Sequence, residues 1–194
     1  MPTLFIIAGC NGAGKTTASF TVLPELLDVK EFVNADEIAR GLSPFQPEKV
    51  PIEAGRIMLS RINELINQNK DFAFETTLAT RSFVSLCKSA QKKGYQVCLT
   101  FFWLDSVELA IERVKQRVKE GGHNIETETI KRRYVAGLKN FFTLYQNVVN
   151  YWLFIDNSIP VQEVIAETRE NAEPIIYNNE KWFKIQDYAN KKNI

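Results

Sequence analysis

One segment constrains the fold of this chain more than any other, the eight residues that begin at Gly9. They read Gly-Cys-Asn-Gly-Ala-Gly-Lys-Thr and match the pattern G-x-x-x-x-G-K-[ST]. The apolar run 4–8 precedes them, as expected for a strand buried on both faces, and a helical pattern follows from Lys15 to about Leu23, where Pro24 should end the helix. A glycine-rich turn between a buried strand and a helix is the context of a phosphate-binding P-loop.

Each fixed residue type in this motif has a physical task. Glycines allow the backbone twist that turns successive N–H groups toward phosphate oxygens, and the N-terminus of the following helix adds a positive field. The Lys15 ammonium is expected at the β- and γ-phosphates, and the Thr16 hydroxyl is expected on Mg²⁺. The chain has no Asn-Lys-x-Asp-like guanine reader, so we expect ATP as the nucleotide. The predicted nucleotide-binding residues of this segment are Gly9, Asn11, Gly12, Ala13, Gly14, Lys15, Thr16 and Thr17.

Composition is needed only to exclude other classes of protein. The 194 residues are 45% hydrophobic and 24% charged, without repeats or low-complexity tracts, so we expect a single domain over residues 1–194. The 24 basic and 23 acidic residues nearly balance, which gives no reason to expect a nucleic-acid partner. Strand-sized apolar runs, the lack of a signal-peptide pattern and three cysteines without C-x-x-C spacing indicate a cytoplasmic protein with no membrane partner.

Apolar runs alternate with helix-period segments along the rest of the chain. Further strands are expected at 31–34, 72–75, 95–104 and 151–155. Helices are expected from about Asp36 onward and at 48–69, 82–93, 106–120 and 127–147, and a hairpin of 161–168 with 175–177 should precede a helix over 180–190. This alternation predicts a three-layer α/β fold, in which helices cover both faces of a parallel sheet.

An acidic residue is expected at the end of a strand beside the P-loop strand, and three candidates compete. Glu75, Asp105 and Asp156 each follow a strand-like apolar run. Asp105 fits best on hydrophobicity, although it precedes Ser106 and a helix, where the N-cap is its alternative role. None of the three belongs to an Asp-Glu pair of the kind found in hydrolytic ATPases, which disfavours a motor ATPase.

A helix–loop–helix pattern at about residues 113–134 predicts a lid with a glycine-containing tip, Gly121-Gly122-His123-Asn124. Its basic residues on the two arms are Arg113, Arg117, Lys131, Arg132 and Arg133. Closing such a lid would exclude water and set guanidinium groups on the transferred phosphoryl group. We assign Arg117 and Arg133 to this task, with Arg132 as the alternative to its neighbour, because consecutive helical positions differ by about 100°. A solvated charged face is the other interpretation, since glutamates are interspersed.

Together these motifs resemble the zeta-toxin-like P-loop kinases. The segments that carry the resemblance are the P-loop, N-A-D-E-I-A at 34–39, F-A-F-E-T-T-L at 72–78, R-V-K-E-G-G-H at 117–123, R-R-Y at 132–134 and D-N-S at 156–158. The resemblance implies a kinase that uses Mg²⁺ and ATP, with an antitoxin protein as an implied partner. Zeta toxins proper phosphorylate the 3′-hydroxyl of UDP-N-acetylglucosamine; they are longer than this chain, so the resemblance transfers the catalytic scaffold and not the acceptor.

The resemblance also assigns roles to residues outside the P-loop. Asp36 matches the acid that orients or deprotonates the acceptor hydroxyl, although capping the helix of residues 37–40 is its structural alternative. Glu75 matches a residue that holds magnesium-bound water or a substrate hydroxyl. The remaining assignments are Thr76 and Arg81 at the acceptor and Asn157 at the nucleotide. Asp36, Lys15, Arg117 and Arg133 form the expected catalytic set.

Two classes of function follow from these observations. The first is a Mg²⁺- and ATP-dependent kinase for a small-molecule hydroxyl, with a UDP-sugar such as UDP-N-acetylglucosamine as the favoured acceptor and a nucleoside or a sugar as the alternative. The second is a nucleotide-binding switch or slow ATPase that acts through a protein partner. Asp36 and the missing Asp-Glu pair favour the kinase.

Overall fold

A seven-stranded sheet with the order β2-β3-β1-β4-β5-β6-β7 forms the centre of the computed structural model, which describes residues 1–122, 124–169 and 172–191. Its strands are β1 (Thr3–Gly9), β2 (Phe32–Val33), β3 (Phe72–Thr76), β4 (Gln96–Trp103), β5 (Tyr151–Asp156), β6 (Glu163–Thr168) and β7 (Ile175–Ile176). The strands β1 to β5 pair in parallel, whereas β6 is antiparallel to both β5 and β7. The α/β class and the hairpin are therefore confirmed, in a sheet that is mixed.

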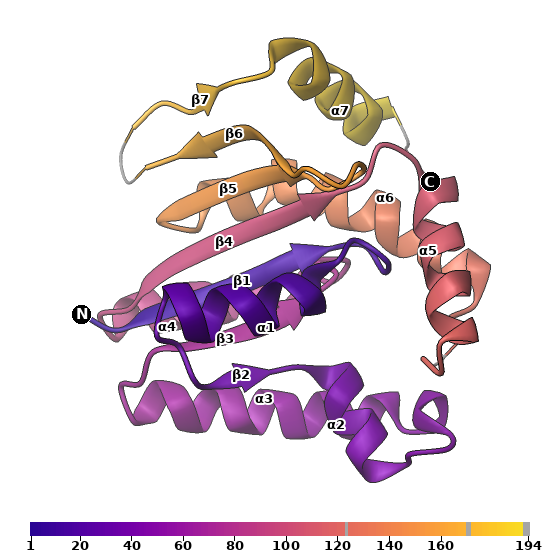
Figure 1. The fold of residues 1–194 in the computed structure, drawn as a ribbon. Helices are drawn as coiled ribbons and strands as arrows, with labels where there is room; N and C mark the ends of the chain where they lie inside the picture. The colour runs from indigo at the N-terminus through magenta and orange to yellow at the C-terminus, as the bar shows by residue number, and fades with distance from the viewer. Residues whose placement is uncertain (123, 170–171, 192–194) are drawn as a thin grey trace.

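Helices cover both faces of this sheet, as Figure 1 shows for α1 in front and α6 behind. The helices are α1 (Lys15–Leu26), α2 (Ala35–Leu42), α3 (Pro51–Asn67), α4 (Ser82–Lys92), α5 (Val107–Lys119), α6 (Thr127–Thr143) and α7 (Asn179–Lys191), with 3₁₀ turns at Pro47–Lys49 and Tyr145–Asn147. Among the described residues, no helix combines the length and the apolar character needed to cross a membrane. The assignment of residues 1–194 to one domain stays a prediction.

The helix after the P-loop runs through Pro24 to Leu26, so the expected end at Pro24 is wrong. A proline in a helix removes one hydrogen bond and crowds the preceding turn. The helix instead ends in a wider, π-type turn after the proline, in which the Leu27 N–H donates to the Val22 carbonyl five residues back, at 3.2 Å. The buried Leu23 side chain keeps this last turn packed against the core.

An aromatic cluster fastens the C-terminal part of the chain to the sheet. Trp182 of α7 is buried and stacks on Trp152 of β5 with ring centroids 5.5 Å apart. Phe141 of α6 contacts both tryptophans edge to face. Burial of such large rings is a major source of stability, so these contacts hold α6 and α7 against β5.

Candidate active site at the ends of the strands

The P-loop lies between the end of β1 and the first residue of α1. Gly14 is the N-cap of α1 with φ of +82°, and a Cβ atom at this position would lie 2.5 Å from Nδ2 of Asn157. Gly9 has φ of +140°, and its Cβ would lie 2.2 Å from the carbonyl oxygen of Phe102. Both positions combine a left-handed backbone with a close approach, so only glycine fits them.

The Lys15 and Thr16 side chains meet one carboxylate, that of Glu75. Lys15 is only 5% exposed, and its Nζ donates to the Cys10 carbonyl at 2.9 Å and lies 3.4 Å from Glu75. The Thr16 hydroxyl donates to Glu75 Oε2 at 2.7 Å, and Asn34 Nδ2 donates to the same oxygen at 3.0 Å. Of the three candidate acids, Glu75 is therefore the one that reaches the P-loop.

Asp105, the acid favoured by hydrophobicity, neither reaches the P-loop nor caps the helix that follows it. Its residue is exposed, and Ser106 is the N-cap of α5, where its hydroxyl accepts from the Leu109 N–H at 3.3 Å. The strand β4 ends at Trp103, so Asp105 lies two residues beyond the C-terminal end of this strand. Apolar character before an acid thus does not decide whether the acid faces the P-loop.

Asp156, the third candidate, is buried but directed toward α7. Its carboxylate accepts from Lys181 Nζ at 2.6 Å and from the N–H and hydroxyl of Ser158. Burial alone would raise the pKa of Asp156, but the hydrogen bonds from Lys181 and Ser158 outweigh it and hold the pKa below its ordinary value. This acid is therefore an ionised structural partner of α7.

Asp36 faces the cavity next to the P-loop, and it does not cap a helix. The N-cap of α2 is Asn34, whose side-chain oxygen accepts from the Asp36 N–H at 2.8 Å. The Asp36 carboxylate lines a cavity of about 280 Å³ together with Lys15 and Glu75. Other polar residues that line this cavity are Asn11, Asn34, Thr76, Thr77, Thr80, Ser82 and Arg133. We call it the acceptor cavity.

The lid arginines are divided between different places. Arg133 lines the acceptor cavity, and its Nη1 donates to Asn11 Oδ1 in the P-loop at 3.2 Å. Burial lowers the pKa of Arg133, while the nearby Asp36 carboxylate acts in the opposite direction. Its neighbour Arg132 is exposed and lines a second cavity of about 910 Å³, together with Arg81. The structure thus brings Arg133 to Asp36 and places Arg81 elsewhere.

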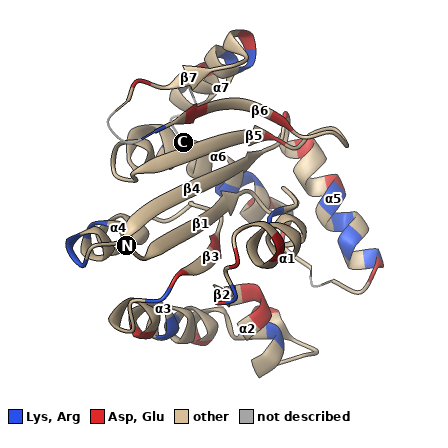
Figure 2. Ribbon diagram, turned by 60° about the vertical axis from the view of Figure 1, so that its left-hand side comes forward, with Lys and Arg blue, Asp and Glu red and all other residues tan. Residues whose placement is uncertain are grey.

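Arg117 packs inside the lid instead of lining the acceptor cavity. Figure 2 shows the basic residues along α5, the first arm of the lid. The Nε and Nη2 atoms of Arg117 are buried and have no hydrogen-bond partner among the described residues. A Cβ on Gly122 would lie 2.7 Å from Arg117 Cγ, so the glycine leaves room for this side chain. His123, expected at the lid tip, lies outside the described residues.

The remaining assigned residues support the loops around the site. The Asn157 amide donates to the Ala13 carbonyl of the P-loop at 2.8 Å. The Thr76 hydroxyl accepts from the Leu78 N–H at 3.0 Å, in a turn where Leu78 has φ of +57°. Thr17 is exposed on the first turn of α1. Sequence reasoning did not single out Asn34, although an asparagine before Ala-Asp-Glu is an N-cap signal.

The chemistry of the donor set fits a magnesium ion that arrives with a nucleotide. Thr16 Oγ1 and Glu75 Oε2 are hard oxygen donors 2.7 Å apart beside the P-loop. Mg²⁺ is usually held in such sites by one or two protein oxygens, with water and phosphate completing its shell. Within the described part of the chain, no group of three or more His, Cys, Asp and Glu side chains is placed to hold a metal.

The Cys10 thiol inside the P-loop is expected to be unreactive. Burial raises its pKa to about 11, although the nearby Lys15 and Arg113 act in the opposite direction. At pH 7.5 we therefore expect Cys10 to react with iodoacetamide about two orders of magnitude more slowly than a free cysteine, because the thiolate is the nucleophile. Mass spectrometry of the native and the urea-denatured protein measures this rate, and native labelling at the rate of free cysteine would contradict the expectation.

Solved structures share this fold over most of the chain. A chain of the crystal structure of AvrRxo1-ORF1:AvrRxo1-ORF2 with sulphate ions superposes with a TM-score of 0.80 at 18% identity, covering 95% of this chain and 63% of that one. The PezAT toxin–antitoxin system of Streptococcus pneumoniae gives a TM-score of 0.63 at 15% identity, covering 98% and 86%. A gluconokinase from Sinorhizobium meliloti gives 0.52 at 13% identity, covering 82% and 84%. These identities show the fold alone, that of P-loop kinases.

Sequence comparison gives the family. An uncharacterized protein of Haemophilus influenzae is 35% identical over 127 residues, which are 65% of this chain and 88% of that protein. The family model described as Zeta toxin matches residues 1–181. The match includes the P-loop, the motif around Asp36 and both arms of the lid. The resemblance inferred from the sequence is therefore confirmed, and the chain belongs to the zeta toxin family.

Proposed function

We propose that this chain is a Mg²⁺- and ATP-dependent kinase that phosphorylates a hydroxyl group of a small molecule. The observation that carries the proposal is the meeting of Lys15, Glu75, Asp36 and Arg133 on one cavity beside the P-loop. A nucleotide-binding switch needs the P-loop and a partner surface, and it has no use for a carboxylate on the acceptor side. The shared cavity therefore favours the kinase.

The P-loop end of the cavity holds the phosphates in this proposal. Lys15 donates to a backbone carbonyl and lies beside Glu75, so its ammonium is directed along the loop that would carry the β- and γ-phosphates. Thr16 and Glu75 would hold the magnesium ion, which neutralises charge on the phosphates when bound. Arg133, bonded to Asn11, lies where a guanidinium can stabilise charge on the transferred group.

Asp36 takes the proton in the transfer step. The acceptor hydroxyl oxygen forms a bond to the γ-phosphorus while the bond from that phosphorus to the β–γ bridging oxygen breaks and ADP leaves. The hydroxyl proton passes to the Asp36 carboxylate. Asn34 positions both acids, because its side-chain oxygen accepts from the Asp36 N–H while its amide donates to Glu75.

A UDP-sugar such as UDP-N-acetylglucosamine, the acceptor of zeta toxins proper, is the favoured acceptor to test first, and a nucleoside or a sugar is the alternative; membership of the family supports the kinase scaffold and does not by itself select the acceptor. An antitoxin protein is the proposed partner, since the PezAT relative is a toxin–antitoxin system. The test is a metabolite screen with γ-labelled ATP, followed by identification of the labelled product. Release of labelled phosphate without any labelled metabolite would favour the switch or slow ATPase instead.

Lys15→Ala is expected to weaken ATP·Mg²⁺ binding at least about tenfold, or about 1.4 kcal/mol, because the buried ammonium at the phosphates is lost. Calorimetry with the folded variant measures the affinity. Lys88→Ala, at an exposed position on α4, is the matched control and should bind ATP as the wild type does. Unchanged affinity and turnover in Lys15→Ala would contradict the P-loop assignment.

A further inference from the structure

The turn that follows β5 contacts two parts of the proposed nucleotide site at once. Asn157 donates to the Ala13 carbonyl in the P-loop at 2.8 Å. The Ser158 carbonyl accepts from Arg113 Nη2 on α5 at 3.0 Å, and the Ser158 hydroxyl accepts from the Asp105 N–H at 2.8 Å. The P-loop and the first arm of the lid therefore share one support, which we call the β5 turn (residues 156–158).

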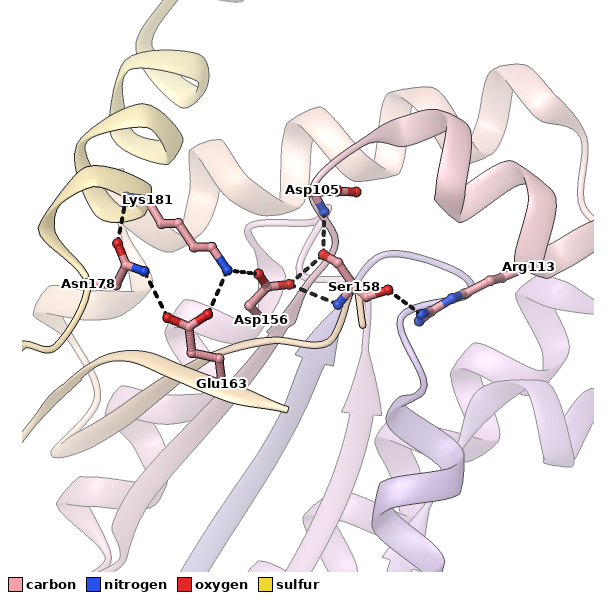
Figure 3. A network of polar contacts seen from close by, with 7 residues as sticks. All are labelled: Asp105, Arg113, Asp156, Ser158, Glu163, Asn178 and Lys181. Atoms are coloured by element: carbon pink, nitrogen blue, oxygen red, sulfur yellow. Dashed lines mark hydrogen bonds and ion pairs between the residues drawn. The ribbon is translucent and has the colours of Figure 1, made fainter. Parts of the chain in front are cut away.

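A buried carboxylate sets the conformation of the β5 turn, as Figure 3 shows. Asp156 is 2% exposed, and one of its oxygens accepts from the Ser158 N–H at 2.8 Å and from the Ser158 hydroxyl. Its other oxygen accepts from Lys181 Nζ of α7 at 2.6 Å. An uncompensated buried carboxylate is strongly unfavourable, so the Lys181 ammonium is what allows Asp156 to stay inside and hold the turn.

We propose that Lys181 and Asp156 are positioning residues of the nucleotide site, which fix the P-loop and the α5 arm of the lid through the β5 turn. Neither residue lines the acceptor cavity, so both act through Asn157, Ser158 and Arg113. Asn157 lies so close to the P-loop that a Cβ on Gly14 would meet its amide at 2.5 Å. A shift of the turn is therefore transmitted directly to the loop that carries the phosphates. This inference rests on the proposed function.

Lys181 also donates to a second carboxylate. This contact allows a role of Lys181 in supporting the β5 turn to be distinguished from a role in attaching α7 to the sheet. Glu163 of β6 is the ladder neighbour of Asp156, and its carboxylate accepts from Lys181 Nζ at 2.6 Å, the same distance as Asp156. Its other oxygen accepts from Asn178 at 2.8 Å, and among the described residues the carboxylate makes no hydrogen bond to Asn157 or Ser158. The helix itself is also anchored independently, since Trp182 is buried against Trp152. Removing the Glu163 charge therefore tests whether the attachment of α7 through Lys181 matters for ATP binding. Removing the Lys181 charge tests whether support of the β5 turn matters.

The experiment compares ATP·Mg²⁺ affinity by calorimetry in four variants of the full chain, at a temperature where melting curves show each to be folded. Lys181→Met, which keeps the length of the side chain and removes its charge, is expected to weaken ATP binding at least fivefold. Lys181→Arg, which restores a cation, should bind within twofold of the wild type. Glu163→Gln, together with Lys184→Met at an exposed position of the same helix, should also stay within twofold.

Two results would overturn the inference. One is wild-type affinity in folded Lys181→Met; the other is an equal loss of affinity in Glu163→Gln, which would reduce Lys181 to an attachment of α7. If Lys181→Met does not fold, ATP affinity is measured in Asp156→Asn instead. This variant keeps a hydrogen-bond acceptor for Ser158 while removing the charge of Asp156. Wild-type ATP affinity in Asp156→Asn would overturn the inference. The readout needs no acceptor: a wild type that binds ATP and labels no metabolite contradicts the kinase alone, and a wild type that does not bind ATP contradicts both.

Discussion

Replacing Asp36 with asparagine is expected to slow phosphoryl transfer by about 10²- to 10⁴-fold, with little change in ATP affinity. Asparagine has the size of aspartate and still accepts a hydrogen bond, but it cannot take the proton that leaves the acceptor hydroxyl. The Asp36 side chain lines the acceptor cavity and makes no capping bond that asparagine would lose. The measurement is single-turnover transfer from γ-labelled ATP to the acceptor, beside calorimetry of ATP binding.

Glu37→Gln is the matched control for Asp36→Asn. Glu37 is the next residue of α2, is exposed, and pairs with Arg40 at 3.3 Å, so its loss removes the same negative charge from the first turn of the same helix. Both variants should therefore lose a similar, small amount of helix stability, while transfer falls only in Asp36→Asn. A sharply lower melting temperature in Asp36→Asn, with normal activity per folded molecule, would show that the carboxylate serves the helix and not the chemistry.

The regular elements could be predicted from the sequence because their periodicity is strong. Met58, Ile62, Leu65 and Ile66 recur at helical spacing, and all four are buried in α3. The end of α1 could not be predicted, because a single widened turn after Pro24 depends on how Leu23 packs. Local patterns thus fix the type of an element better than its last residue.

The candidate site shows the same limit. The P-loop is contiguous, so its residues could be read directly, but the choice among the acids depends on the register of neighbouring strands. Glu75 lies within β3 and pairs with Ile7 of β1, two residues before the P-loop begins at Gly9, whereas Asp105 lies two residues beyond the end of β4. The pairing of Asp156 with Lys181 joins residues 25 positions apart through tertiary packing, and no local pattern predicts it.

Arg133→Ala is expected to raise the barrier to phosphoryl transfer by about 2.7–4 kcal/mol, or about 10²- to 10³-fold in rate, and to weaken ground-state ATP binding far less. The Arg133 guanidinium is half-buried, reaches Asn11 in the P-loop and shares a cavity with Asp36. A cation held in place before the reaction stabilises charge that develops on the transferred group without further reorganisation. Rate constants at saturating ATP, beside calorimetric affinities, separate the two effects.

Arg132→Ala is the control that the helix itself supplies. Arg132 precedes Arg133 on α6, carries the same charge, and is exposed at the second cavity, so its removal changes the net charge equally and should alter the transfer rate by less than about threefold. Equal losses in the two variants would mean that the lid acts through its overall charge. A loss of transfer rate confined to Arg132→Ala would indicate that phosphoryl transfer takes place at the second cavity. Arg117, on the opposite arm of the lid, enters the same comparison. Its buried Nε and Nη2 atoms have no hydrogen-bond partner among the described residues and would gain a phosphate partner only if the lid closes. Arg117→Ala should therefore lower the transfer rate while leaving ground-state ATP affinity nearly unchanged.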